Sequence, residues 1–467
     1  MVDLQSVNPA TGAVIATYRP HTAAEVEGRL ARAAGAAERW RAVPLTERAA
    51  LLARVADLLE QRRETYARLI TDEMGKLLGD ARLEVAKCAT ACRYYAEHAA
   101  AMLALETIRT EAARSYVVFD PLGPVLAVMP WNFPFWQLFR FAAPGIVAGN
   151  VALLKHASNV CGAAQALEEL WHDAGAPSGV FQTLLIPAAA VAAVVADERV
   201  RAVTLTGSER AGISIATAAG SVCKKCVLEL GGSDPFIVLA DADPEQAARA
   251  AASARVVNGG QSCIAAKRFI VARAIAEPFT RALVDVMRGL RVGDPLRPET
   301  QVGPLARADL RDEVAQQVAR SVAAGARCLT GGDALPGPGW FYAPTVLADV
   351  RPGMAAFDEE VFGPVAAVTA AADPDEAVGL ANLTRYGLGA SVWTRDPARA
   401  EMLARRLDAG MVFINEAVRS DPRLPFGGVK RSGYGRELSH YGIREFANVR
   451  TIVVAPPSAT PTGSSVE

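Results

Sequence analysis

One cysteine of this chain has neighbours that could make it reactive. Cys263 lies in GGQSCIAAKRF (259–269), after two glycines and before two cations. A free thiol with a pKa of about 8.5 is mostly protonated at neutral pH, so a nucleophilic cysteine needs a cationic or dipolar setting. The small residues around Cys263 fit a loop that runs into a helix, whose N-terminus would supply that setting. The alternative is a small buried side chain that only packs.

A glutamate with similarly apolar neighbours could act as a general base. Glu229 lies in VLELGG, after leucine and before two glycines. Carboxylates are seldom fully buried without a reason, and apolar surroundings raise a carboxyl pKa toward the range of a general base. The glycines would let a substrate or another backbone approach. A structural glutamate held in a salt bridge is the alternative.

Two further segments suit a phosphate or a ribose. TGSERAG (206–212) has the spacing G-x-x-x-x-G, which differs from the usual dinucleotide fingerprint. If it opens a helix, the free N–H groups of the first turn favour a phosphate, and Ser208 adds a hydroxyl donor. Lys155 ends the apolar segment VALLK. It would either reach a cofactor or extend its ammonium group to solvent.

The elements that must position these residues alternate between strands and helices. From residue 124 onward, short apolar runs such as PVLAVM (124–129) are separated by helical stretches. This alternation predicts βαβ units and a parallel sheet covered on both faces. Right-handed crossovers place the strand C-termini along one edge. We therefore expect four segments on one edge: PWNFP (130–134), KHAS (155–158), TGSERAG (206–212) and ELGG (229–232).

The regions before and after this sheet have different patterns. Residues 45–70 repeat apolar positions at helical spacing, and a second helical stretch over 83–100 places Cys88 and Cys92 one turn apart, where we expect them to pack. A second α/β run follows residue 232 and contains Cys263. The tail 455–467 lacks apolar residues, so we expect it to be disordered.

Composition narrows the class of protein. The 467 residues are 51% hydrophobic with a formal net charge of −1, which gives no reason to expect nucleic acid or an anionic membrane as a partner. No apolar run of membrane-spanning length and no secretory signal is visible. Seven cysteines predict reduced thiols in a cytoplasmic protein. Cys223 and Cys226 have C-x-x-C spacing, but no second pair completes a zinc site, so we expect no metal.

Taken together, these segments resemble the aldehyde dehydrogenase superfamily. PWNFP, LELGGSDPF, GQSC, EEVFGPV and PFGGVKRSGYGRE occur in the order of that family, and the resemblance runs from about Asn8 to Val454. It implies an α/β fold with three parts and a homodimer or homotetramer. The parts are a Rossmann-like cofactor-binding domain (1–106 and 122–231), a catalytic α/β domain (232–442) and a small β oligomerisation arm (107–121 and 443–454).

The resemblance also implies a reaction. Cys263 matches the nucleophile of the family, Glu229 its general base, and Asn132 the side-chain donor of its oxyanion hole. An aldehyde would be oxidised to a carboxylic acid through a cysteine thiohemiacetal and a thioester. A catalytically silent relative is an alternative, and so is a member that passes the acyl group to coenzyme A. Retention of the three residues argues against the first, and Glu229 favours water over coenzyme A as acceptor.

The cofactor implied by the resemblance is NADP, with NAD as the alternative. Many members that prefer NAD carry a glutamate at the position of Ser158. The hydroxyl found here would not repel a 2′-phosphate, and Lys155 could form an ion pair with that phosphate. The resemblance further implies Glu360 for the nicotinamide ribose, Gly207 and Ser208 for the pyrophosphate, Trp131 and Leu230 near the nicotinamide, and Phe362 as another cofactor-binding residue.

The aldehyde implied is succinate semialdehyde. Arg140 and Ser420 match carboxylate contacts of members that act on it, and LLKHASN resembles a bacterial branch with that activity. The alternative for Arg140 is an exposed helix cation. Val257 replaces a second arginine of some of those enzymes, so glutarate semialdehyde and neutral or aromatic aldehydes are further candidates. Ala265 replaces a resolving cysteine, so we expect no disulfide switch at Cys263.

Overall fold

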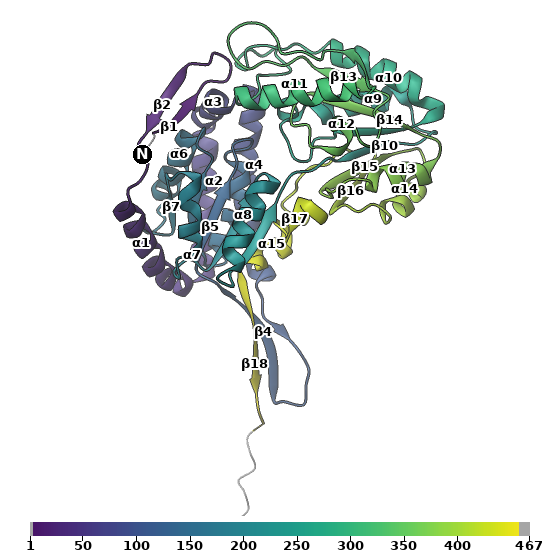
Figure 1. The fold of residues 1–467 in the computed structure, drawn as a ribbon. Helices are drawn as coiled ribbons and strands as arrows, with labels where there is room; N and C mark the ends of the chain where they lie inside the picture. The colour runs from purple at the N-terminus through teal and green to yellow at the C-terminus, as the bar shows by residue number, and fades with distance from the viewer. Residues whose placement is uncertain (1–2, 457–467) are drawn as a thin grey trace, which may run out of the picture.

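The computed structural model describes residues 3–456, so most of the tail expected to be disordered lies outside the described residues. The predicted α/β architecture is confirmed, with two mainly parallel sheets in separate lobes and an arm that projects from the first lobe (Figure 1). The chain begins with the antiparallel strands β1 (Leu4–Val7) and β2 (Val14–Tyr18).

The first sheet has six strands in the order β17-β9-β8-β5-β6-β7, of which β17 alone is antiparallel to its neighbour. Its parallel strands are almost entirely buried because helices cover both faces. β17 comes from the C-terminal part of the chain. The strands are β5 (Pro124–Met129), β6 (Val151–His156), β7 (Phe181–Thr183), β8 (Ala202–Thr206), β9 (Lys225–Glu229) and β17 (Gly433–Tyr434).

The helices of the first lobe follow the predicted pattern with one difference. The helix expected over 45–70 is two helices, α2 and α3, which separate at Arg62, where the backbone leaves helical geometry. Cys88 and Cys92 are fully buried in α4, which confirms that they pack. The helices are α1 (Ala23–Ala42), α2 (Leu45–Gln61), α3 (Arg63–Met74), α4 (Leu78–Met102), α5 (Trp136–Val147), α6 (Cys161–Asp173), η1 (Ala188–Ala190), α7 (Val191–Ala196), α8 (Glu209–Gly220) and α15 (Ser439–Glu445).

The second sheet has seven strands in the order β12-β13-β14-β11-β10-β15-β16, with β12 antiparallel at one edge. Its strands are β10 (Pro235–Val238), β11 (Arg268–Ala272), β12 (Arg327–Thr330), β13 (Thr345–Ala348), β14 (Val365–Ala371), β15 (Gly389–Trp393) and β16 (Met411–Ile414). Its helices are α9 (Pro244–Val256), η2 (Val257–Gly260), α10 (Arg273–Arg288), α11 (Ala308–Ala323), α12 (Ala355–Asp358), α13 (Pro374–Asn382), α14 (Pro397–Ala404) and η3 (Lys430–Ser432).

The projecting arm is a three-stranded antiparallel sheet (Figure 1). β18 (Ala447–Val454) pairs along its whole length with β4 (Arg114–Pro121), and β3 (Glu106–Thr107) adds two residues on the other side. β18 is therefore an edge strand whose outer backbone groups are available for pairing.

The expectation of a helix directly after Cys263 is wrong. Cys263 follows η2 and lies in a turn that leads into strand β11. Small residues are compatible with either a turn or a helix. The apolar run that starts at Phe269 forms a buried strand of the second sheet, and Cys263 lies in the turn before it. Gly260, with φ of 81°, lies so close to the backbone of Gly363 that a Cβ would overlap it. No helix dipole of a following helix acts on Cys263.

Within residues 3–456, no helix is long and apolar enough to cross a membrane. In the same range, no group of three or more histidine, cysteine or acidic side chains is arranged to hold a metal ion. All seven cysteines are free thiols, including Cys223 and Cys226.

Candidate active site

The register of the first sheet brings the predicted segments to one edge. β5 pairs in parallel with β6 on one side and with β8 on the other, and β8 pairs with β9. The segments after these strands therefore share the carboxyl edge, and the chain order reverses at β5. In open α/β sheets this reversal creates the crevice in which ligands bind.

The carboxyl edge carries a cation that has no partner among the described residues. Lys155 is the penultimate residue of β6, is half-buried, and makes no side-chain hydrogen bond or ion pair within residues 3–456. Burial lowers the pKa of its ammonium group. Ser158, two residues after the strand, is exposed and neutral. An unpaired cation beside a hydroxyl fits an anionic ligand such as a phosphate.

The turn after β8 fits the same ligand. Ser208 is the N-cap of α8, and its hydroxyl oxygen accepts from the Ala211 N–H at 3.3 Å, so the hydroxyl hydrogen stays free to donate. A Cβ placed on Gly207 would meet nothing closer than Leu205 at 3.6 Å. The backbone at the N-terminus of this twelve-residue helix is therefore open to a phosphate.

Glu360 connects the second lobe to the segment after β9. Its Oε1 accepts from the Gly232 N–H at 3.0 Å and lies 3.7 Å from Lys267 Nζ. Burial raises the pKa of Glu360, and Lys267 opposes that shift. A Cβ on Gly231 would overlap the Glu360 carboxylate, so only glycine allows this approach. This contact holds Glu360 beside the segment that follows β9, so both belong to the same site.

The remaining cofactor candidates lie close to these groups. The rings of Trp131 and Phe362 meet edge to face with centroids 5.8 Å apart. Leu230 is buried, and its N–H donates to the Ser432 carbonyl at 2.9 Å. Trp131 follows β5 and Leu230 follows β9, so both lie at the carboxyl edge of the sheet.

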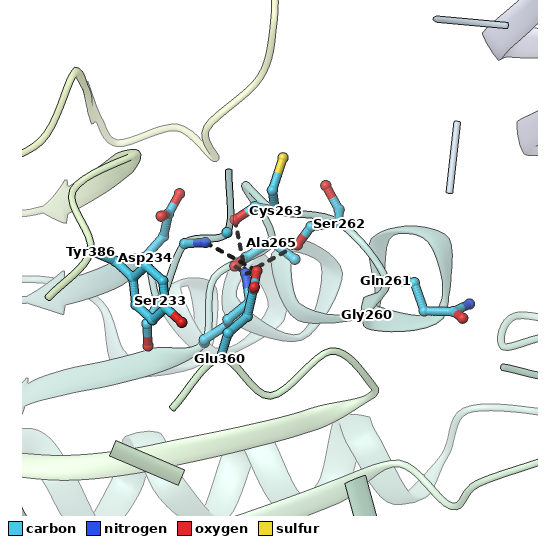
Figure 2. A network of polar contacts seen from close by, with 12 residues as sticks. Ser233, Asp234, Gly260, Gln261, Ser262, Cys263, Ala265, Glu360 and Tyr386 are labelled. Atoms are coloured by element: carbon cyan, nitrogen blue, oxygen red, sulfur yellow. Dashed lines mark hydrogen bonds and ion pairs between the residues drawn. The ribbon is translucent and has the colours of Figure 1, made fainter. Parts of the chain in front are cut away.

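Lys267 holds the turn that presents Cys263. Its ammonium group donates to the backbone carbonyls of Ser262 at 3.0 Å, Cys263 at 2.8 Å and Ala265 at 3.1 Å. The Cys263 sulfur points away from this polar network (Figure 2). Lys267 is 2% exposed, and its three hydrogen bonds satisfy carbonyls that a helix would otherwise use. The buried Lys267 side chain therefore stabilises a turn at Cys263, where a helix was expected.

The Cys263 thiol is protonated in the free protein at neutral pH. Burial raises its pKa to about 12, although the positive charges of Arg140 and Lys267 act in the opposite direction. Without a following helix, these two cations are the electrostatic groups that favour the thiolate. A ligand or a base must contribute the rest of the activation.

Asn132 lies against the same turn. Its side-chain Nδ2 donates to the Gln261 carbonyl at 3.0 Å, and its own carbonyl accepts from Asn258 Nδ2 at 2.8 Å. An amide nitrogen carries two donors, so one N–H of Asn132 remains available. This hydrogen bond holds Asn132 against the turn that carries Cys263, two residues after Gln261 in the chain.

Glu229 is positioned differently. It ends β9 and is 2% exposed, and neither carboxylate oxygen has a hydrogen-bond partner within residues 3–456. Burial and the nearby Glu437 raise its pKa well above the usual value, and Arg140 partly offsets the shift. Its carboxyl group lies against Gly427 and does not line the cavity that contains Cys263. The sheet brings Glu229 near the site, but not into contact with the thiol.

A cavity of about 460 Å³ contains Cys263 and both predicted substrate residues, Arg140 and Ser420. Arg140 is 2% exposed, so it is not a solvent-exposed helix cation. Its Nε lies 2.6 Å from Glu437 Oε2, and its Nη2 donates to Thr206 at 3.2 Å. The Arg140 charge is therefore already paired within the protein. Val257 also lines this cavity, where it offers no charge.

Three residues of the site were missed from the sequence. Lys87 lines the cavity from α4, Lys267 holds the Cys263 turn, and Glu437 pairs with Arg140. The signal for Lys87 was a cation between apolar helix positions, next to buried Cys88. Lys267 could have been flagged as a cation directly before a buried strand. Nothing local distinguishes Glu437.

Comparison with known proteins decides the family. The model of the aldehyde dehydrogenase family matches residues 2–452. This chain belongs to the aldehyde dehydrogenase family.

Named relatives of this aldehyde dehydrogenase cover nearly all of it. It is 51% identical to a probable NADP⁺ succinate-semialdehyde dehydrogenase of Synechocystis sp., over 97% of this chain and 100% of that protein. It is also 51% identical to the NADP⁺ succinate-semialdehyde dehydrogenase of Mycobacterium avium, over 96% of each chain. Among solved structures, the succinic semialdehyde dehydrogenase of Streptococcus pyogenes in complex with NADP⁺ has a TM-score of 0.95 and 39% identity, over 97% of this chain and 100% of that one.

Proposed function

We propose that this aldehyde dehydrogenase oxidises succinate semialdehyde to succinate with NADP⁺. The observation that carries the proposal is the cavity that holds Cys263 together with cationic and hydroxyl side chains, beside a crevice with an unpaired cation. The names of the relatives that cover its full length support the same substrate and cofactor.

The residues of the crevice fit NADP⁺. Lys155 has no partner among residues 3–456, and Ser158 brings no carboxylate that would repel a 2′-phosphate. The open backbone at Gly207 and the N-terminus of α8 suit the pyrophosphate. Glu360 would hold the nicotinamide ribose, close to the Cys263 turn. When bound, the nicotinamide supplies a hydride acceptor.

The protein's own residues would act in sequence. The Cys263 thiol passes its proton to water, and its sulfur attacks the aldehyde carbon; the C=O π electrons move to the oxygen, which gives a thiohemiacetal oxyanion. The free N–H of Asn132 and the backbone N–H of Cys263 hold this oxyanion. Loss of a hydride leaves a thioester. Glu229 takes a proton from water, which attacks the thioester carbon and releases the acid and the Cys263 thiol.

Glu229 must turn toward the thioester for the last step. Its carboxyl oxygens make no hydrogen bond within the described residues, so rotation breaks none. Its raised pKa means that the base form is populated more as pH increases. We expect hydrolysis of the thioester to accelerate with pH for this reason.

The division of the chain is part of the proposal. Residues 1–106 and 122–231 would bind the cofactor, and 232–442 would carry the nucleophile, although β17 from that range completes the first sheet. Residues 107–121 and 443–454 would join subunits into a homodimer or homotetramer. The exposed side chains of Val449 and Val453 and the open edge of β18 support this role. The free thiols support a cytoplasmic location.

Steady-state kinetics test the proposal. We expect kcat/KM with NADP⁺ for succinate semialdehyde to exceed that for butanal, a neutral aldehyde of equal length, by ~10–100-fold, since a charge-assisted carboxylate contact has that magnitude. Equal values would contradict the proposed substrate. A larger kcat/KM for NAD⁺ than for NADP⁺ would contradict the proposed cofactor.

A further inference from the structure

One wall of the Cys263 cavity consists of hydrogen-bond donors from three different elements. Lys87 comes from α4, Trp136 from α5 and Ser420 from the segment after β16. Lys87 Nζ donates to Ser420 Oγ at 2.7 Å and lies 4.4 Å from the centroid of the Trp136 ring. Trp136 Nε1 also donates to Ser420 Oγ, at 3.1 Å.

These contacts leave the three side chains Lys87, Trp136 and Ser420 with free hydrogen-bond donors and no free acceptor. A hydroxyl oxygen accepts at most two hydrogen bonds, and Ser420 Oγ already accepts two. The remaining hydrogen-bonding capacity of Ser420 is its own O–H, which makes no bond within residues 3–456. The Lys87 ammonium group has three N–H donors and uses one of them. An anion with two or more acceptor oxygens complements this arrangement.

The two carboxylates that raise the pKa of Lys87 are already paired with other cations. Glu84 forms a buried ion pair with Lys76, and Asp421 lies 2.6 Å from Arg423. Within residues 3–456 no carboxylate lies within ion-pair distance of Lys87. Burial of an ammonium group without a counter-charge is unfavourable, so a ligand that supplies the charge is favoured.

Arg140 lines the same cavity but, unlike Lys87, already has a counter-charge. Its guanidinium group pairs with Glu437, contacts Thr206, and lies 4.3 Å from the centroid of the Phe426 ring. A substrate carboxylate would have to compete with Glu437 for it. Lys87 faces no such competitor.

We propose that Lys87, together with the Ser420 hydroxyl, binds the carboxylate of the substrate, and that Arg140 is a positioning residue held by Glu437. This inference rests on the proposed function, because it names the side chain that recognises the acid end of the semialdehyde. The aldehyde end then points toward Cys263 within the same cavity. Lys87 therefore sets the preference for acidic over neutral aldehydes.

The test compares two aldehydes in variants of Lys87. The quantity measured is the ratio of kcat/KM for succinate semialdehyde to that for butanal, with NADP⁺ and the full-length enzyme. We expect Lys87→Met, which keeps the aliphatic length, to lower this ratio ~10–100-fold, mainly through KM. Lys87→Arg should restore at least part of it. Lys225→Met is the matched control on an exposed lysine paired with Glu445, and it should keep the wild-type ratio.

A pH profile separates recognition from a structural role. Burial, together with the Arg140 charge, lowers the pKa of Lys87 to about 8, although Cys88, Asp421 and Glu84 act in the opposite direction. The ammonium form binds the carboxylate, so the ratio should fall as pH rises above about 8. In Lys87→Arg the guanidinium stays charged, and the ratio should not fall.

The outcomes distinguish this inference from the proposed function. A wild-type enzyme that prefers butanal would overturn both. A wild-type preference for the acid that survives in Lys87→Met, or equal losses on both aldehydes, would overturn the role of Lys87 and leave the proposed function standing. In that event the ratio in Arg140→Lys would show whether Arg140 is the carboxylate contact instead.

Discussion

Replacing Lys267 with methionine isolates what holds the nucleophile in place. Methionine keeps the length and apolar stem of lysine but removes the ammonium group, which donates to three carbonyls of the Cys263 turn. Lys267 is fully enclosed, so water cannot readily replace these bonds. We expect Lys267→Met to loosen the turn and to lower activity, although Lys267 contacts neither substrate nor cofactor in the proposed mechanism.

The magnitude follows from opposing contributions. A buried carbonyl left without a donor destabilises by ~1–3 kcal/mol. The Ser262 carbonyl keeps a hydrogen bond from the Ala265 N–H, so the two carbonyls of Cys263 and Ala265 are the ones left unsatisfied, which gives ~2–6 kcal/mol. Removal of the buried ammonium group relieves a desolvation penalty of several kcal/mol. Loss of one partner from a buried charged network typically destabilises by ~3–5 kcal/mol, which we take as the expected value. A difference of 3 kcal/mol corresponds to a factor of ~100 in a local opening equilibrium.

Hydrogen exchange measures this directly. The amides of Ala265 and Ala266 donate to the carbonyls of Ser262 and Ala254, so opening of the turn exposes them. We expect their exchange to accelerate at least ~100-fold in Lys267→Met. Lys155→Met is the control, because it removes a half-buried ammonium group that has no acceptor in the described part of the chain, and it should leave these amides unchanged. Unchanged exchange in Lys267→Met, with unchanged alkylation of Cys263 by iodoacetamide, would refute the reasoning.

Two further substitutions test the site. Asn132→Ala should lower kcat ~10²–10³-fold by removing the oxyanion donor, measured as NADPH formation at saturating aldehyde; a loss below tenfold would contradict that role. Ser158→Glu should lower the ratio of kcat/KM for NADP⁺ to that for NAD⁺ by at least ~10-fold, because the carboxylate repels a 2′-phosphate. An unchanged ratio would place the 2′-phosphate away from Ser158.

The carboxyl edge of the first sheet was predictable because short apolar strands alternate with helices. Strands such as β5 and β8 begin and end close to the predicted residues, and the right-handed crossover rule then fixes which segments meet. Asn132, Lys155 and Gly207 lie on that edge as expected. The break between α2 and α3 at Arg62 was not predictable, since both helices have the same apolar periodicity.

By itself, the sequence determined the α/β architecture, the family, and the residue types available for chemistry, because these depend on local patterns and motifs. The tertiary structure alone decided which charges are paired. Arg140 was expected to be free for the substrate, but Glu437, almost three hundred residues later in the chain, lies against it. Lys87, by contrast, forms no ion pair within residues 3–456. Likewise, Lys267 rather than a helix N-terminus supports Cys263. Electrostatic partners are set by distances in space, and no spacing along the chain records them.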